Sequence, residues 1–446
     1  MPHQHLNYIG PVPESPFVVE LTRDLIQLDT TNPPGQEDIA IELIERVLDE
    51  AGISSQRYEN ARGRANLVAR LKGRGEAPPF LLQGHVDVVT TVNQDWAHKP
   101  FGGEVVDGYL WGRGALDMKG GVAMMVNAML QAKAKGGAPG ELVLAVLADE
   151  EAGGNQGAKY LVDKHADLFK GIKHGIGESG GVVQHLGGKR FYPIMVSEKR
   201  GCQVLATLRG PGGHGSIPSH GGAMAKLGAL LTTLDAARLP VHITPPVRLL
   251  LEGMRDALDE PWKQRIGSLL DPVLADATLS ELGPLGRNLD AALHNTVNAT
   301  IVSGGLKVNV IPSEVSVQLD GRLLPGFGPE DMLRELRRVI GPDPELEVQL
   351  VGPAQPEVDL SQFDLLASII READPGSVPV PFLVTGGTDA RHFAKLGIRT
   401  YGFLPLNNPA DFNGSATIHA ADERVPVTAL EFGAHCVFEA VMRYRG

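Results

Sequence analysis

The chain has 446 residues, which is too long for one typical domain, so we expect two or three. With 43% hydrophobic and 21% charged residues, its composition is that of a globular protein with a sizeable core. The net charge of −12 and the lack of any block of Lys and Arg argue against a nucleic-acid partner.

The sequence shows no signal for membrane insertion or secretion. No run of about 18 apolar residues is present, and the first residues lack a basic segment followed by an apolar one. The two cysteines, Cys202 and Cys436, lie far apart in the chain. We expect free thiols and a cytoplasmic protein that binds no membrane, and a single disulfide is the alternative.

The first third of the chain alternates helix-like and strand-like segments. Residues 17–53 have the amphipathic pattern of two helices, with a break at Asn32-Pro33-Pro34-Gly35. Strand-like runs follow at residues 66–71, 80–89 and 141–150, and a helix-like segment at 120–135 lies between the last two. This alternation predicts an α/β layer with a mixed, largely parallel sheet.

The pattern changes at residue 199, where a β-α-β-β-α-β series begins that is typical of a small α+β domain. Residues 241–295 form an extra helical stretch inside this series. The α/β pattern resumes after Pro353. We therefore expect residues 199–353 to be inserted into a larger domain made of residues 1–198 and 354–446.

The apolar run FLLQGHVDVV brings His85 and Asp87 to the end of a buried strand. Ligands bind at the carboxyl ends of strands in open α/β sheets. Side chains two residues apart share a face of a strand, so Asp87 can lie beside His85 and fix its ring. Carboxylates act in this way behind metal-bound imidazoles.

Four later motifs offer further acidic or imidazole side chains at the junctions of elements. They are Asp117 in GRGALDMKGG, the triplet Asp149, Glu150 and Glu151 in VLAVLADEEAGG, Glu178 in GIGESGG, and His419 in ATIHAADERV. Asp117 could instead begin a helix, and the triplet could be a solvated turn. Adjacent carboxylates after an apolar strand are costly, however, unless a cation is present.

Imidazole together with carboxylate is the ligand set of zinc and its first-row relatives rather than of calcium. Two histidines and three carboxylates exceed the needs of one tetrahedral zinc ion. Two metal ions that share a bridging carboxylate use them all.

The motifs GHVDVV, GRGALDMKGG, DEEAGG, GESGG, GGTDARHF and HAADER resemble the M20 family of zinc-dependent peptidases and amidohydrolases. That family includes carboxypeptidases, aminoacylases, acetylornithine deacetylase and succinyl-diaminopimelate desuccinylase. The resemblance implies a two-zinc exopeptidase-like catalytic domain with an inserted ferredoxin-like lid. It also implies two Zn²⁺ ions per subunit, for which Co²⁺ can substitute.

The resemblance further implies a role for each residue of these motifs. His85 and Glu178 would hold one zinc ion, Glu151 and His419 the other, and Asp117 would bridge them, with a cis peptide bond between Asp117 and Met118. Glu150 would be the general base, and Asp87 would support His85.

The predicted lid contains RGPGGHGSIPSHGG, a glycine-rich segment that lacks the Gly-Lys-Ser/Thr ending of a phosphate loop. The resemblance gives His214 the task of stabilising the oxyanion, across a dimer interface in dimeric relatives. A turn histidine without a task is the alternative, and His220 lies close enough to be confused with it.

The candidate substrate-binding residues are Asn309, Arg322, Gly387 and Thr388, of which Asn309 and Arg322 match positions that contact a substrate carboxylate or carbonyl in the family. Arg322 could recognise a carboxylate through its two-pronged guanidinium group, or it could lie on a solvated face. Gly387 and Thr388 belong to TGGTDARHF, whose small residues could present backbone amides. His392 in the same motif has no family role, and we expect it at the surface.

We therefore expect a homodimeric hydrolase that cleaves an amide or peptide bond next to a free carboxylate, in an N-acyl amino acid or a short peptide. TPPVRLLLEGM and DTTNPPG point to the carboxypeptidase S-like branch. One alternative is a biosynthetic deacylase of the acetylornithine or succinyl-diaminopimelate type. Another alternative is a catalytically silent metal-binding protein. A nucleotide-binding enzyme is a weaker alternative, because this chain lacks the Gly-x-Gly-x-x-Gly motif that such enzymes carry between a strand and a helix.

Overall fold

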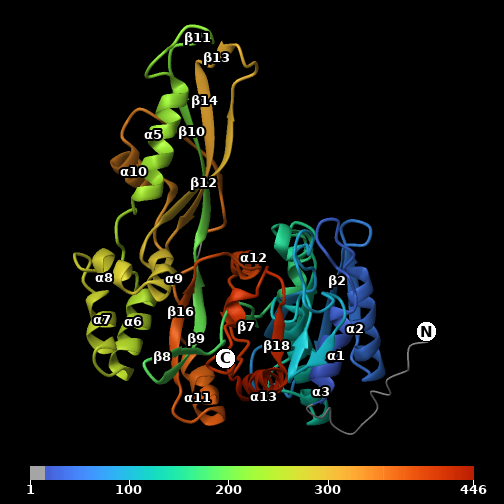
Figure 1. The fold of residues 1–446 in the computed structure, drawn as a ribbon. Coiled ribbons are helices and arrows are strands. Elements are labelled where there is room, and N and C mark those ends of the chain that lie inside the picture. Colours follow the sequence, from blue (N-terminus) through green and yellow to red (C-terminus); the bar gives the residue numbers. More distant parts are fainter. Residues whose placement is uncertain (1–15, 355) are drawn as a thin grey trace. The chain divides into compact units, whose positions relative to one another are not determined.

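The computed structural model describes residues 16–354 and 356–446 (Figure 1). The chain forms two compact units. Among the described residues, the main unit comprises those up to Val196 together with Asp359–Phe382 and Thr388–Gly446, and the insert unit comprises those of Ser197–Val358 together with Leu383–Gly387. Each unit has a sheet and a core of its own.

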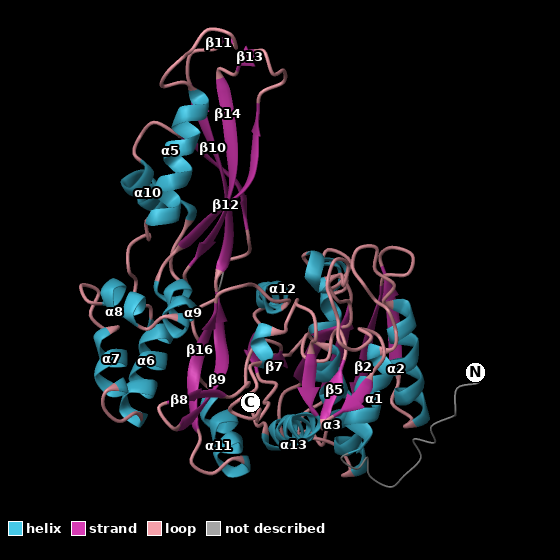
Figure 2. Ribbon diagram, viewed as in Figure 1, coloured by secondary structure: helices cyan, strands magenta, loops and turns pink. Residues whose placement is uncertain are grey.

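The main unit is built on a nine-stranded sheet in the order β1-β2-β6-β3-β7-β17-β9-β16, with β8 paired to β9. Figure 2 draws the strands in magenta. The strands are β1 (Ser55–Glu59), β2 (Ala65–Leu71), β3 (Phe80–His85), β6 (Leu142–Leu147), β7 (His174–Gly177), β8 (Gln184–Leu186), β9 (Lys189–Glu198), β16 (Val378–Val384) and β17 (Arg399–Gly402). The central strands β6, β3, β7 and β17 are parallel, and antiparallel pairs flank them. The mixed, largely parallel sheet predicted from the sequence is confirmed.

The central strands are buried because helices cover both faces of the sheet. Along β6, Leu142, Leu144 and Val146 pack into one apolar cluster, and the alternate residues pack into a second cluster on the opposite face. The first cluster includes α1 (Pro16–Ile26), α2 (Asp38–Glu50), α3 (Lys119–Ala134), α11 (Phe363–Ala373) and α13 (Val427–Arg443). The second includes α4 (Ala158–Lys164) and α12 (Ala390–Phe393).

A small second sheet in the main unit joins distant parts of the chain. It consists of β4 (Glu104–Val106), β5 (Tyr109–Trp111) and β18 (Arg424–Pro426), in the order β18-β5-β4. The antiparallel pair β5–β18 aligns Trp111 with Arg424. It therefore brings the segment before Asp117 next to the segment after His419.

The insert unit contains a four-stranded antiparallel sheet in the order β12-β14-β10-β15. Its elements follow the predicted β-α-β-β-α-β series: β10 (Arg200–Arg209), α5 (Ala223–Ala236), β12 (Thr296–Gly304), β14 (Glu314–Leu323), α10 (Pro329–Ile340) and β15 (Glu345–Val351). Leu227 of α5 and Leu336 of α10 pack with Val204 and Val317 of the sheet. The pair β11 (Gly213–His214) and β13 (Val310–Ile311) forms a separate ladder.

The extra stretch predicted between the first helix and the second strand of this series is helical, as expected. It forms α6 (Pro245–Ala257), α7 (Trp262–Ser268), α8 (Ala275–Glu281) and α9 (Pro284–Leu293). Cys202 and Cys436 are both buried free thiols, which confirms the expectation from their spacing. Within residues 16–354 and 356–446, none of the helices has the length and apolarity needed to cross a bilayer.

Candidate metal centre

Three neighbouring strand ends supply most of the predicted site. His85 is the last residue of β3, and Glu178 directly follows β7. Glu150 and Glu151 begin a short 3-10 turn just after β6. Because β3 runs parallel to both β6 and β7, the carboxyl ends of all three strands meet at one edge of the sheet.

Two residues from outside the sheet complete the group. Asp117 precedes α3, and its peptide bond to Met118 is cis, as the family resemblance implies. His419 precedes β18 and has a φ of 61°, which places its backbone in the left-handed region. A non-glycine residue persists in this region only when its surroundings hold it there.

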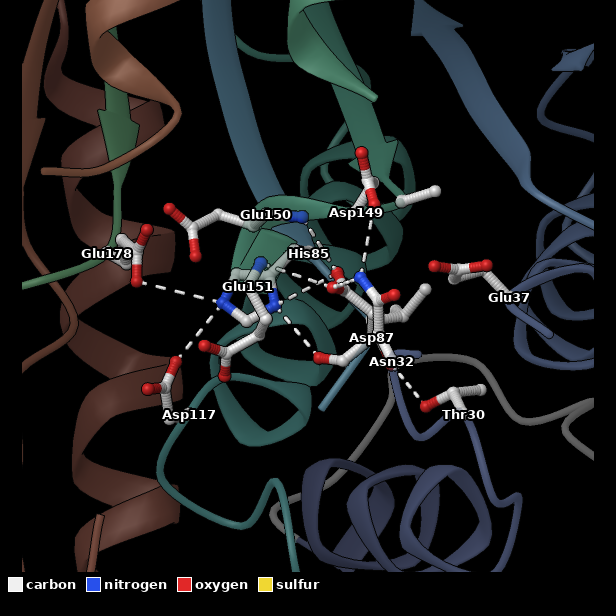
Figure 3. A network of polar contacts seen from close by, with 12 residues as sticks. Thr30, Asn32, Glu37, His85, Asp87, Asp117, Asp149, Glu150, Glu151 and Glu178 are labelled. Carbon is white, nitrogen blue, oxygen red and sulfur yellow. Dashed lines mark hydrogen bonds and ion pairs between the residues drawn. The ribbon is translucent and has the colours of Figure 1, made fainter. Parts of the chain in front are cut away.

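The carboxylate of Asp117 faces two histidines at once. Its Oδ1 lies 3.1 Å from Nε2 of His85, and its Oδ2 lies 3.2 Å from Nε2 of His419. Glu178 Oε2 lies 3.7 Å from the same atom of His85, and Glu151 Oε1 lies 3.2 Å from that of His419. The side chains thus form two groups of three donors that share Asp117, and Figure 3 shows the group around His85.

The donor set fits divalent metal ions. One ligand atom from each of His85, Asp117 and Glu151 lies within 4.8 Å of the others, and the same is true of His85, Glu150 and Glu178. Imidazole nitrogens and carboxylate oxygens are the donors that zinc accepts. Four carboxylates against two imidazoles leave an excess of negative charge, which a cation would offset.

The electrostatics of the cluster favour positive charge. Hydrogen bonds to Asp117 and Glu151 raise the pKa of His419 to about 10. Burial alone would lower the pKa of His85, but hydrogen bonds to Asp117 and Asp87 raise it well above its usual value. Burial also raises the pKa of Glu178, and that of Glu150 by a large amount. A divalent cation would relieve both the burial and the repulsion of these carboxylates.

Asp87 lies behind the cluster and is fully buried. Its carboxylate accepts hydrogen bonds from the backbone N–H groups of Glu150 (3.1 Å) and Glu151 (3.2 Å) and from Nδ2 of Asn32 (2.8 Å) (Figure 3). Nδ1 of His85 is closer to the backbone oxygen of Asp87 (3.0 Å) than to its carboxylate (3.5 Å). The Asp87 side chain therefore fixes the backbone of the 150–151 turn, and its contact with the imidazole ring of His85 is the longer one.

The side chain of Asp149 bonds away from the donor cluster. Its carboxylate accepts hydrogen bonds from Asn32 Nδ2 (3.1 Å), Arg64 Nη2 (2.8 Å) and the N–H of Gln156 (3.0 Å), and its φ is 70°. Arg64 also pairs with the buried Glu37 through two hydrogen bonds of 2.7 and 2.8 Å. No motif in the sequence marks Arg64 or Glu37, whereas Asn32 belongs to the DTTNPPG motif.

The segment that begins at Thr388 adds buried groups near Glu150. Nη1 of Arg391 lies 3.7 Å from Oε1 of Glu150. Asp389 is buried, and its two carboxylate oxygens have no hydrogen-bond partner among the described residues. Burial raises the pKa of Asp389 to about 8. Thr388 is also buried, at 1% exposure, and its Oγ1 accepts a hydrogen bond from the N–H of Ala390.

The expectation that His392 lies at the surface is wrong. Its exposure is 5%, because it lies on α12 beside the backbone of Gly154. Burial lowers the pKa of its imidazole to about 4. Its neighbour Phe393 packs with residues of α4 in an apolar cluster, and this contact holds α12 against the main unit.

The remaining predicted residues lie in the insert unit. His214 is exposed on β11, with its Nδ1 2.7 Å from Oγ of Ser216. The backbone oxygen of Asn309 accepts a hydrogen bond from the N–H of Gly215, the residue after His214. Arg322 pairs with Asp320 at 3.0 Å at the far end of β14 from Asn309. The structure thus brings His214 and Asn309 together but not Arg322. Gly387 is the last residue of the short segment 383–387.

Comparison with known proteins decides the family. The model of peptidase family M20/M25/M40 matches residues 81–443, which span every residue proposed above for metal binding. The chain belongs to this peptidase family. It is therefore a hydrolase of peptide or amide bonds, and the predicted resemblance is confirmed.

Individual relatives are distant. The chain is 29% identical over 377 residues to a probable carboxypeptidase S-like protein of Dictyostelium discoideum, covering 81% of this chain and 71% of that protein. It is 29% identical over 419 residues to a succinyl-diaminopimelate desuccinylase of Cereibacter sphaeroides, covering 93% and 95%. The M20 family metallo-carboxypeptidase of Sulfolobus solfataricus shares the fold, with a TM-score of 0.67, 18% identity and coverage of 95% and 98%.

We expect the protein to bind two zinc ions per chain. His85→Ala and His419→Ala should each lose about one of them, because each removes a donor from a different group of three. Elemental analysis after dialysis against a weak chelator measures the content. His435→Ala, an exposed histidine on α13, is the control and should keep both ions. Full metal content in both site variants would contradict the assignment.

Proposed function

We propose that the protein is a two-metal hydrolase that cleaves an amide or peptide bond next to a free carboxylate, with Glu150 as the general base. The observation that carries the proposal is the geometry of Asp117, whose two oxygens face two different histidines. His85 and Glu178 would hold one ion, and Glu151 and His419 the other. When bound, two zinc ions supply Lewis acidity and a water molecule that is acidic at neutral pH.

Glu150 is the carboxylate of the cluster that is best placed to move a proton. Asp117, Glu151 and Glu178 each lie next to a histidine Nε2, whereas the nearest charged partner of Glu150 is Arg391 at 3.7 Å. One carboxylate oxygen of Glu150 nevertheless lies within 4.8 Å of a ring nitrogen of His85 and of a carboxylate oxygen of Glu178. Its backbone is fixed by Asp87. A carboxylate in this position can take a proton from water and give it to the leaving nitrogen.

The proposed substrate is an N-acyl amino acid or a short peptide. The relatives described above are named as a carboxypeptidase S-like protein and a succinyl-diaminopimelate desuccinylase, and both names denote removal of an amino acid or of an acyl group. We propose that Arg322, Gly387 and Thr388 recognise the carboxylate or carbonyl of the substrate. His214 and Asn309, which lie at the other end of β14, would enter the site of a partner subunit, where His214 would stabilise the oxyanion. Arg322 would then exchange its surface partner Asp320 for the substrate carboxylate, which a two-pronged guanidinium group suits.

Glu150→Gln should lower kcat by at least about 10³-fold, because general base catalysis is lost while the donor groups stay intact. The zinc content should remain that of the wild type. The matched control is Glu372→Gln, an exposed glutamate that pairs with Arg443, and its kcat should be unchanged. Turnover retained in Glu150→Gln would remove this residue as the base.

A substrate panel tests the reaction class. N-acetyl, N-succinyl and long-chain N-acyl amino acids, together with dipeptides, should release amine when zinc is supplied. Their carboxamide analogues should react at least about 10-fold more slowly, because the guanidinium pair to the carboxylate is lost. Hydrolysis of N-succinyl-diaminopimelate alone would favour the biosynthetic alternative. No turnover of any member with zinc bound would favour the catalytically silent alternative.

We also propose that the protein forms a homodimer through the insert unit. The strand β12 is an edge of its sheet, and Ile301 and Val302 on it are 61% and 54% exposed. Leu306 and Val308 in the following loop are fully exposed. An unpaired edge with apolar side chains is a template for pairing with a second strand.

Light scattering should give the mass of a dimer for the wild type. Ile301→Lys should reduce it to that of a monomer, because a charge would be buried at the paired edge. Val273→Lys, at a site that is 86% exposed in the helical stretch, is the control and should remain dimeric. A monomeric wild-type protein would rule the dimer out.

A further inference from the structure

A buried ion pair lies behind the proposed metal site. Nη1 of Arg113 donates to Oε2 of Glu423 at 2.6 Å, and the two side chains are 1% and 0% exposed. Arg113 belongs to the loop that leads to Asp117, and Glu423 belongs to the loop that follows His419. The pair therefore joins two loops that are about 300 residues apart in the chain and that each supply a donor.

Glu423 fixes the backbone that presents Asp117. Its Oε1 accepts hydrogen bonds from the N–H groups of Leu116 (2.8 Å) and Asp117 (3.1 Å), and its Oε2 accepts one from that of Gly114 (3.0 Å). The carboxylate is thus surrounded by three backbone donors and the guanidinium of Arg113. Any shift of this carboxylate would move the backbone of Asp117.

Arg113 fixes the backbone that presents His419. Its Nη2 donates to the backbone oxygen of Ala420 (3.0 Å) and to Oε1 of Gln94 (2.9 Å). Nε2 of Gln94 in turn donates to the backbone oxygen of His419 (3.0 Å). These donors hold the carbonyls at and after the left-handed residue His419, which explains how its φ of 61° persists.

The paired strands β5 and β18 hold together one end of each of the two loops that carry Asp117 and His419. Their ladder aligns Trp111 with Arg424, and the N–H of Gly112 continues it by donating to the oxygen of Glu423 at 2.9 Å. The strands fix the stems of both loops, but Asp117 and His419 lie beyond the ladder. The side chains of Arg113, Glu423 and Gln94 span that remaining distance.

We propose that Arg113, Glu423 and Gln94 are positioning residues that set the separation between Asp117 and His419, and so the affinity for the ion that these two donors share. The inference rests on the metal site of the proposed function. A buried ion pair contributes little net stability by itself, because desolvation offsets the attraction. Groups that orient metal ligands, in contrast, change metal affinity when they are removed.

Gln94→Leu is the decisive variant. Gln94 is half-buried and uncharged, so its removal leaves no unpaired buried charge. The variant should bind one of the two zinc ions about 10- to 100-fold more weakly in competition with a chromophoric chelator. The visible spectrum of the Co²⁺-loaded protein should change, whereas the metal-free protein should still unfold in one cooperative transition.

The matched control is Gln27→Leu. Nε2 of Gln27 also donates to a distant backbone oxygen, that of Gly102 at 3.2 Å, but this loop supplies no donor to the cluster. Its zinc affinity and Co²⁺ spectrum should equal those of the wild type. Arg113→Lys extends the test, because a lysine ammonium cannot reach Glu423, Gln94 and Ala420 together.

The outcomes separate this inference from the proposed function. If the wild type binds two ions and Gln94→Leu binds both with the same affinity, the positioning role is wrong and the proposed function stands. An equal loss of affinity in Gln27→Leu would also overturn the inference. A wild type that binds no metal would instead refute the proposed metal site itself.

Discussion

Repulsion among carboxylates is the constraint on which this structure depends. Asp117, Glu150, Glu151 and Glu178 are all at least four-fifths buried and share one small volume with two imidazole rings. Four negative groups in a medium of low polarity cannot all remain ionised without a compensating charge. The parallel strands β6, β3 and β7 nevertheless bring three of them together, because the apolar clusters on both faces of the sheet fix the positions of the strand ends. The fold thus stabilises an arrangement that its own electrostatics oppose, and bound cations would resolve the conflict.

Much of this arrangement is local in the sequence and could be predicted from it. Apolar runs that end near His85 or near Glu150 and Glu151 predict strands whose carboxyl ends face a ligand. The β-α-β-β-α-β series likewise predicts the sheet of the insert unit. The family motifs add the pairing of donors, because their order in the chain matches that of the M20 peptidases. In the structure, the carboxylate of Asp117 lies between His85 and His419.

Other parts could not be predicted because they depend on contacts between distant residues. Nothing in the sequence around Arg64 shows that its guanidinium group reaches both Glu37 and Asp149. The pairing of Arg113 with Glu423 requires knowledge of which loops the strands β5 and β18 bring together. His392 has no role in the family motif, which predicts a place at the surface, and its burial depends on the packing of α12, which the sequence does not show.

Several residues beside the donor cluster share the left-handed backbone described for Asp149 and His419. Ser179, next to Glu178, has a φ of 68°, and Asp422, next to Glu423, has a φ of 62°. Replacing such residues with glycine commonly relieves strain in the folded chain, at the expense of more freedom in the unfolded chain. An engineer who seeks heat resistance here would therefore meet a trade-off, because four of the described non-glycine residues with positive φ lie in or beside the loops of the proposed metal site.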